Sequence, residues 1–146
     1  MDKSFTTFEI AKMLKIDRNL LAQWLMRGYI SPSVKRAQGL GSKNLFSLQD
    51  LYNICLFQQL IDSGIVREEA KLYTGINFRS IGDGKNDSKF AVITRKNKKS
   101  GRDEGLIMDI RLEKYAPKIV FEDDDSFIVI INLLGIKRRV DRMIAS

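Results

Sequence analysis

Apolar residues recur at helical spacing in two short stretches near the start of the chain. Thr6 and Glu9 form a Thr-x-x-Glu pair, in which each side chain caps a free backbone N–H at a helix start. Apolar positions then continue to Leu14. Asp17 is typical of a second N-cap, and the next apolar series ends before Gly28, which readily adopts the left-handed conformation that closes a helix. The pattern predicts two short helices joined by a turn of about three or four residues.

Two short helices in this order form either a helix-turn-helix or an ordinary helical hairpin with a polar outer face. Their spacing along the sequence does not separate these interpretations. The apolar face of the second expected helix consists of Leu20, Leu21, Trp24 and Leu25. Its outer face carries Arg18, Asn19, Gln23 and Arg27. In both interpretations this polar face is free to contact a partner.

A basic, glycine-containing segment separates these helices from the next one. Residues 33–47 (SVKRAQGLGSKNLFS) follow a short stretch, 29–30, that is expected to be an extended strand. Gly39 and Gly41 permit a tight chain reversal because glycine adopts positive φ without a steric penalty. Leu45 and Phe46, near the end of the segment, are expected to anchor the returning strand in the core. The segment is therefore predicted to be a basic hairpin.

A longer helix is predicted to begin after Ser47, which forms a Ser-x-x-Asp capping pair with Asp50, and to end near residue 63. Its apolar side is expected to contain Leu48, Leu51, Ile54, Cys55, Gln58 and Ile61. A shorter, weakly capped helix is expected over about residues 65–73. Its inward positions are Val66, Ala70 and Tyr73.

The pattern changes after Tyr73. Residues 76–89 are polar and rich in turn formers, which indicates a linker or long loop. Strand-like runs follow at 90–94, 106–112, 118–121 and 127–133, and residues 134–145 have the spacing of an amphipathic helix. The expected organisation is a first domain over 1–75, a linker over 76–89 and a small α+β segment over 90–146 that serves dimerisation or effector binding.

Two charged runs lie in the second half of the chain. The basic run at 95–102 is interpreted as a solvated loop, with a contact to DNA as the alternative. The four adjacent acidic residues at 122–125 are interpreted as a solvated turn, because neighbouring carboxylates point in different directions.

Composition narrows the classes of function. The chain has 146 residues, of which 44% are apolar, so it can bury a core. Its net charge of +7, concentrated in the first two thirds, favours polyanionic partners. The absence of His and the single Cys exclude the usual zinc sites and an internal disulfide. We expect no cofactor or metal, and we interpret Cys55 as a small buried core residue, with a thiol sensor as the alternative.

The sequence has neither a signal-type apolar start nor a run of roughly 18 apolar residues, so we expect a soluble, cytoplasmic protein without a membrane partner. An enzyme is not expected, because there is no His and no pair of carboxylates in an apolar setting. The Gly39-Leu40-Gly41 sequence also lacks the preceding strand, following helix and third glycine of a nucleotide site.

Four segments within residues 5–75 together resemble the DNA-binding domain of the MerR family of bacterial transcriptional regulators. They read FTTFEIAKML, DRNLLAQWLMRGYISPS, GLGSKNLFSLQDL and LIDSGIVREEAKLY. The resemblance covers about half of the chain and implies a winged helix-turn-helix. The expected fold is therefore α+β: a MerR-like winged helix-turn-helix domain followed by a small β-rich segment with a C-terminal helix.

The resemblance implies a sequence-specific regulator of transcription that binds double-stranded DNA. Asn and Gln side chains pair with adenine in the major groove and Arg pairs with guanine, while Lys and Arg contact phosphates. The candidates for base contacts are Arg18, Asn19 and Gln23. The candidates for phosphate and wing contacts are Arg27, Lys35, Arg36, Lys43 and Asn44. Each is otherwise an ordinary solvated surface residue.

The chain also departs from the family. Ala22 and Gln23 stand where the family's recognition helix usually has Arg and Tyr, and Lys43-Asn44 replaces an Arg beside an aromatic residue. The long dimerisation helix of typical members is missing. We still expect a homodimer, because two half-sites increase the affinity of a small module. No group of residues identifies a small-molecule effector.

Two other functions remain open at this point. An excisionase-like architectural factor would share the winged helix-turn-helix parts and would bend DNA. A protein-interaction module would use the winged domain to bind another protein, and the basic hairpin argues against it. A steep fall of DNA affinity with salt distinguishes DNA binding from protein binding.

Overall fold

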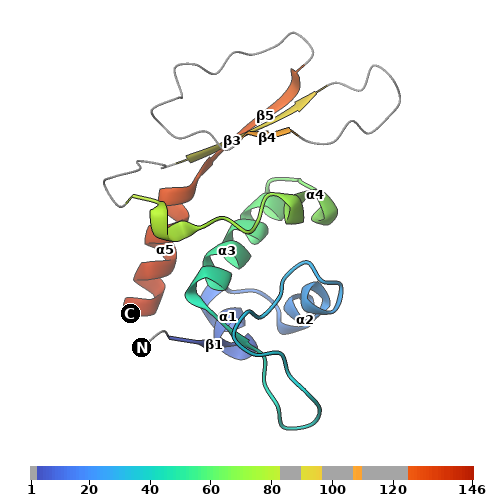
Figure 1. The fold of residues 1–146 in the computed structure, drawn as a ribbon, viewed down its shortest axis with the longest axis vertical. Coiled ribbons are helices and arrows are strands. Elements are labelled where there is room, and N and C mark those ends of the chain that lie inside the picture. Colours follow the sequence, from blue (N-terminus) through green and yellow to red (C-terminus); the bar gives the residue numbers. More distant parts are fainter. Residues whose placement is uncertain (1–2, 83–89, 97–106, 110–124) are drawn as a thin grey trace. The chain divides into compact units, whose positions relative to one another are not determined.

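The structure, a computed structural model, describes residues 3–82, 90–96, 107–109 and 125–146 (Figure 1). The described residues form helices and two small antiparallel sheets, which is compatible with the expected α+β class. They belong to two compact units. The first unit consists of Met1–Asn77 and Arg139–Ser146, and the second of Phe78–Arg138.

The first two helices form where the capping residues predict them. In α1 (Thr7–Leu14), the Thr6 hydroxyl accepts from the Glu9 N–H at 3.2 Å, and the Glu9 carboxylate accepts from the Thr6 N–H at 3.1 Å. In α2 (Arg18–Met26), the Asp17 carboxylate accepts from two backbone N–H groups at 2.8 and 3.2 Å. Both predicted N-caps are therefore confirmed.

The core beneath α2 contains Trp24 and Phe57. Trp24 is buried and meets the Phe57 ring edge-on, with the ring centroids 4.9 Å apart. The Tyr29 ring stacks on the same Phe57 ring at 5.8 Å. The strand expected at residues 29–30 is absent from the structure. Ile30 is buried instead, and both residues form part of a bend that closes over the core.

A two-stranded sheet connects the start of the chain to the end of the hairpin. β1 (Phe5–Thr6) pairs antiparallel with β2 (Leu45–Phe46), and Phe5 lies opposite Phe46. Both phenylalanines are buried, at 1% and 0% exposed. The prediction that Leu45 and Phe46 anchor the returning strand is confirmed for Phe46, whereas Leu45 is only half-buried.

The central helix of the first unit is α3 (Leu48–Asp62), which begins at the predicted capping pair of Ser47 and Asp50. The expectation of a single apolar side is wrong. Leu48 is exposed and Ile61 is half-buried. The buried residues extend around most of the helix because other elements pack on several sides of it; they are Leu51, Tyr52, Ile54, Cys55, Leu56, Phe57 and Leu60.

The short helix α4 (Arg67–Leu72) follows, with Val66 and Tyr73 as its capping residues. Val66 was expected to face inward, but it is the N-cap and is 61% exposed. Ile65 is buried in its place, together with Ala70 and Tyr73. The helix therefore begins at Arg67, two residues later than the predicted start at Ile65.

The C-terminal helix α5 (Leu133–Ala145) forms as predicted, and its residues from Arg139 onward belong to the first unit. The expected division assigned them to the C-terminal segment. The packing of this part of α5 explains the difference: Val140 is fully buried, and the buried Tyr52 of α3 donates a hydrogen bond to the Asp141 carboxylate.

Cys55 of α3 is also fully buried, and burial raises the pKa of its thiol, so its interpretation as a core residue is confirmed.

Replacing Tyr52 by Phe is expected to lower the free energy of unfolding by about 1.5–3 kcal/mol near neutral pH, because a hydrogen bond to a charged group is lost. Burial and the bond to Asp141 raise the pKa of Tyr52 above its ordinary value of 10.0. This contribution to stability is therefore complete below that value and is lost as the pH rises beyond it. Urea unfolding of both proteins at about pH 8 and about pH 11 measures the difference. An equal loss of stability in the two proteins would contradict the role of this bond.

The second unit contains a three-stranded antiparallel sheet in the order β4–β3–β5. β3 (Phe90–Lys96) pairs with β4 (Ile107–Asp109) on one side and with β5 (Asp125–Asn132) on the other. The predicted strands at 90–94 and 127–133 are confirmed, as is the centre of the one at 106–112. The strand expected at 118–121, and the greater part of both charged runs, lie outside the described residues.

Residues 76–89, for which a linker or long loop is expected, contain a partly buried segment near their start. The turn η1 (Phe78–Ser80) begins at Phe78, which is fully buried, and Ile81 is 3% exposed. The Lys137 ammonium donates to the Ile81 carbonyl at 2.9 Å. Phe78 and Ile81 are three residues apart, a helical spacing that their polar and turn-forming neighbours made hard to recognise in the sequence. Residues 83–89 lie outside the described residues.

Candidate nucleic-acid interface

The outer face of α2 is exposed, as its polar sequence predicts. Arg18, Asn19, Gln23 and Arg27 are all exposed. Two residues between them, Ala22 and Met26, are also exposed, and Met26 retains 79% of its surface. The buried side of the same helix is formed by Leu21 and Trp24. Because the core holds α2 through these two residues, the opposite side is presented on a rigid element.

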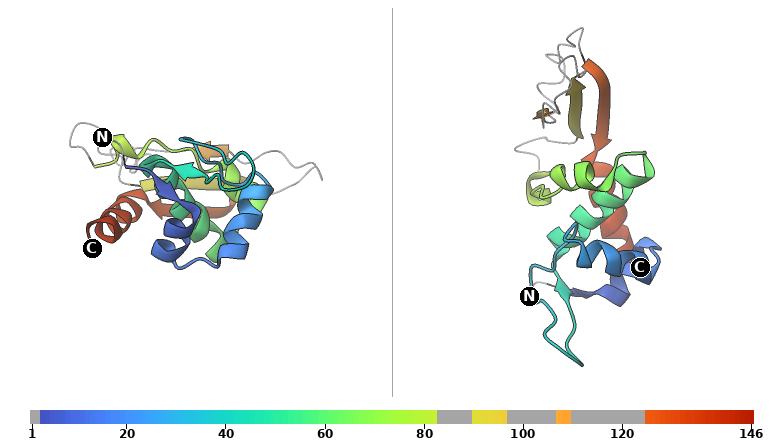
Figure 2. Two further views of the ribbon diagram at one scale, coloured as in Figure 1. Left: turned by 90° about the horizontal axis from the view of Figure 1, so that it is seen from below. Right: turned by 90° about the vertical axis from the view of Figure 1, so that its right-hand side faces the viewer.

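Residues 31–45 form a hairpin that projects away from the helices of the first unit (Figures 1 and 2). Lys35 and Leu45 pair across it, with N–H to O distances of 3.2 and 2.8 Å. Two side chains bond across it nearer the tip. The Asn44 amide oxygen accepts from the Ala37 N–H at 2.8 Å, and the Ser42 hydroxyl accepts from the Gln38 N–H at 3.1 Å. The hairpin is therefore shaped by its own hydrogen bonds.

The charged side chains of the three cations of the hairpin take no part in these bonds. Lys35, Arg36 and Lys43 are exposed, and no ion pair to any of them occurs within the described part of the chain. The Asn44 carbonyl oxygen holds the hairpin together by accepting from the Ala37 N–H. Its amide NH₂ group, which is the group that would donate to a phosphate, takes no part in this bond.

A groove of about 430 Å³ lies where the hairpin meets the two N-terminal helices. It is lined by Thr6, Thr7, Phe8, Arg18, Ser42, Lys43 and Asn44. Arg18 from α2 and Lys43 from the hairpin thus line one groove, although they are distant in the sequence. The Arg18 guanidinium lies over the Phe8 ring, 5.2 Å from its centroid, a cation–π contact that orients the charge. The lining contains two cations and no carboxylate.

Arg27 lies at the other end of α2, in a different electrostatic environment. The Tyr29 hydroxyl donates to the Glu68 carboxylate at 2.6 Å, and this bond lowers the pKa of Glu68. Arg67 and Arg27 lower the pKa of the same carboxyl further. A neighbouring negative charge therefore offsets part of the charge of Arg27.

Sequence reasoning missed three exposed apolar residues in this region. Phe8 is 55% exposed beneath Arg18, Met26 lies on the outer face of α2, and Leu40 is fully exposed at the hairpin tip. The signals were present in the sequence. Met26 falls among the polar positions of its helix, and Leu40 lies between two glycines in a basic segment.

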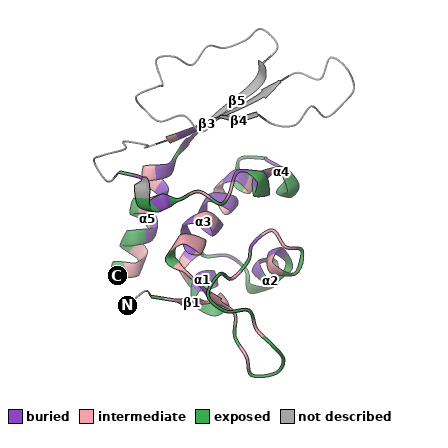
Figure 3. Cartoon of the chain, viewed as in Figure 1, coloured by how far each residue is buried: buried purple, intermediate pink, exposed green. Residues whose placement is uncertain are grey.

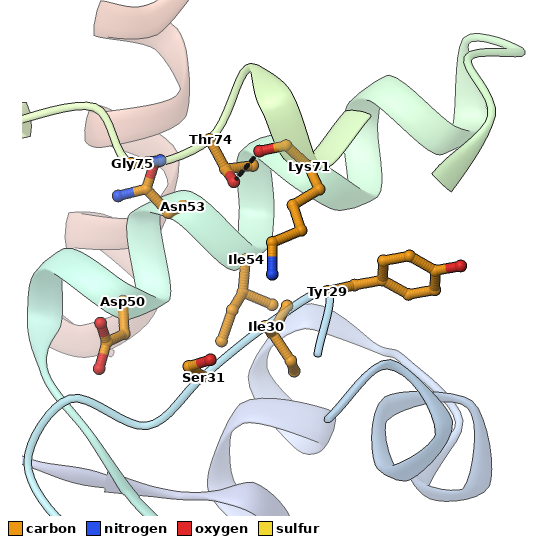
Figure 4. Close-up of a pocket in the computed structure, with 9 residues that line it drawn as sticks. All are labelled: Tyr29, Ile30, Ser31, Asp50, Asn53, Ile54, Lys71, Thr74 and Gly75. Carbon is orange, nitrogen blue, oxygen red and sulfur yellow. Dashed lines mark hydrogen bonds between the residues drawn. The ribbon is translucent and has the colours of Figure 1, made fainter. Parts of the chain in front are cut away.

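A second, smaller pocket of about 210 Å³ lies beside α4 (Figure 4). It is lined by Tyr29, Ile30, Ser31, Asp50, Asn53, Ile54, Lys71, Thr74 and Gly75. Asn53 donates to two backbone carbonyls and accepts from two backbone N–H groups. Asp50 accepts from the Ser33 and Ser47 N–H groups, and Lys71 donates to the Gly28 carbonyl. These polar groups hold the chain segments around the pocket together.

Within the described ranges, no three His, Cys, Asp or Glu residues lie close enough to hold a metal ion. No helix in the part of the chain that the structure describes is long and apolar enough to cross a membrane. No protein-family model and no curated protein sequence matches the chain.

Proposed function

We propose that the chain is a sequence-specific regulator of transcription with a MerR-like winged helix-turn-helix that binds double-stranded DNA. In this proposal α2 enters the major groove, and the hairpin of residues 31–45 is the wing that follows the phosphate backbone. The observation that carries the proposal is the groove in which Arg18 of α2 and Lys43 of the hairpin converge without a carboxylate. The guanidinium of Arg18 and the ammonium of Lys43 suit a phosphate or a base edge.

The chemistry of the exposed side chains divides into two roles. The amides of Asn19 and Gln23 suit adenine, and the guanidinium of Arg18 suits the two acceptors of guanine. Phosphate contacts from the hairpin cations position α2 but read no sequence. A rigid polar helix beside a basic hairpin supplies both roles, whereas a protein-interaction surface has no need of three uncompensated cations.

We further propose that the chain binds DNA as a homodimer in the cytoplasm. A single short helix contacts few base pairs, so a second copy on a second half-site would raise both affinity and specificity. A monomer in analytical ultracentrifugation at micromolar concentration, with undiminished DNA binding, would contradict the dimer and leave the DNA contacts standing.

Selection of bound duplexes from a random pool by the full chain tests the proposed function. We expect a short preferred sequence, and we expect Arg18→Ala and Gln23→Ala to relax preference at different positions within it, by roughly 1–3 kcal/mol each. The matched control is Arg67→Ala, an exposed cation of α4 that should leave the preference unchanged. Selection that enriches no sequence, or variants that leave it unaltered, would contradict a role of α2 in reading bases.

A further inference from the structure

The tip of the hairpin presents a lone leucine to solvent. Leu40 is fully exposed, and the hairpin from residue 31 to residue 45 contains no buried residue (Figure 3). Gly39 and Gly41 flank it with φ values of +81° and +79°, a backbone conformation that other residues rarely adopt. A Cβ at either glycine would meet no atom within 4 Å, so the positive φ, and not a lack of space, is what favours glycine at these two positions.

The tip is held in place before any ligand binds. The Lys35–Leu45 bridge and the Asn44 and Ser42 side-chain bonds connect the two arms of the hairpin, and the Ser42 N–H donates to the Gly39 carbonyl at 3.4 Å. A backbone ordered by these bonds has already lost part of the conformational freedom that binding would otherwise remove. Leu40 is thus prepared for contact while it remains unpartnered within the described part of the chain.

The charges around the tip indicate the kind of partner. Lys35 and Arg36 lie on one arm and Lys43 on the other, and all three are exposed. No acidic residue occurs in residues 32–49. The tip is apolar and has cations on both sides. It therefore complements a surface with a narrow channel that has apolar walls and a row of negative charges along each edge.

We propose that Leu40 enters the minor groove of the DNA as an apolar wedge while α2 occupies the adjacent major groove; this inference rests on the proposed DNA binding. The minor groove is about 6 Å wide, which admits one aliphatic side chain between glycines but not a helix. Its walls are sugars and its rims are phosphates, matching the leucine and the cations respectively. An inserted leucine partly unstacks a base step and kinks the duplex by roughly 20–90°.

A membrane surface would offer a similar combination of negative charge and apolar interior, but it fits less well. One leucine buries too little apolar surface to hold a protein on a bilayer, since even a single myristoyl chain gives only marginal binding. The DNA groove needs only one side chain, because Arg18 and the polar face of α2 supply the remaining contacts.

Leu40→Ala tests the wedge in the full chain, with Leu40→Met as the conservative variant and Leu72→Ala, an exposed leucine of α4, as the matched control. Energy transfer between dyes at the two ends of a selected duplex reports bending, and fluorescence anisotropy reports affinity. We expect the wild type, the Met variant and the control to bend the duplex. The Ala variant should bind roughly ten- to a hundredfold more weakly and bend it less.

Equal bending and affinity for Leu40→Ala and wild type would overturn the wedge while leaving DNA binding intact. Failure of the wild type to bind any duplex would overturn the proposed function and the wedge together. Binding of the wild type, but not of Leu40→Ala, to vesicles containing phosphatidylglycerol, without binding to DNA, would instead assign the tip to membranes.

Discussion

Replacing Lys35, Arg36 and Lys43 together by alanine is expected to weaken binding to all duplexes, on the order of 10²- to 10³-fold at about 0.1 M salt. Each phosphate that a cation neutralises releases condensed counterions, and this release provides affinity without reading sequence. The three side chains are exposed and form no ion pair within the described part of the chain, so their removal should not disturb the fold.

The measurement is fluorescence anisotropy of a labelled duplex over a series of salt concentrations. The slope of log K against log salt should become shallower by roughly 2.7, about 0.9 for each lost contact. A second triple variant with Arg67, Arg138 and Arg142 replaced by alanine removes the same charge from other exposed positions and should retain most of the slope. Equal losses in the two variants would mean that net charge, and not the hairpin, determines the affinity.

Phe46→Ala is expected to lower the free energy of unfolding by about 3–5 kcal/mol. Phe46 is fully buried and lies opposite Phe5 in the sheet that joins the hairpin to the start of α1. The substitution removes apolar contacts and leaves a cavity that its neighbours fill only in part. Since whole domains are stable by only about 5–15 kcal/mol, this loss is a large share of the total.

Chemical denaturation of the wild type and of Phe46→Ala, followed by circular dichroism, measures this effect. Leu48→Ala, two residues further on, is the control, because Leu48 is 37% exposed and surface substitutions usually change stability by less than about 0.5 kcal/mol. A Phe46→Ala protein as stable as the control would show that the hairpin is not anchored through this residue.

Local features of the fold were predictable from the sequence. The Thr6–Glu9 and Ser47–Asp50 capping pairs involve residues three apart, so the sequence alone places both helix starts. The burial of Phe78 and the exposure of Val66 depend on packing between distant segments. The spacing of apolar residues along one helix does not show which other segments pack against it. The sequence therefore predicted one apolar side for α3, whereas buried residues extend around most of the helix.

The candidate interface shows the same division. The exposure of Arg18 and Gln23 follows from helical spacing, whereas the approach of Lys43 to Arg18 depends on the pairing of β1 with β2. The structural bond of Asn44 and the proximity of Arg27 to Glu68 also arise from chain folding. Residue type and spacing therefore predicted which side chains are exposed. Which of these side chains lie close together depends on the tertiary fold.

Chemical-shift mapping of the isotope-labelled full chain, titrated with a selected duplex, tests most directly whether α2 and the hairpin bind DNA together. We predict that the largest backbone amide shifts occur in residues 17–27 and 35–45, with small shifts over α4. Binding that shifts neither of these two segments, or shifts confined to other parts of the chain, would contradict the proposed interface.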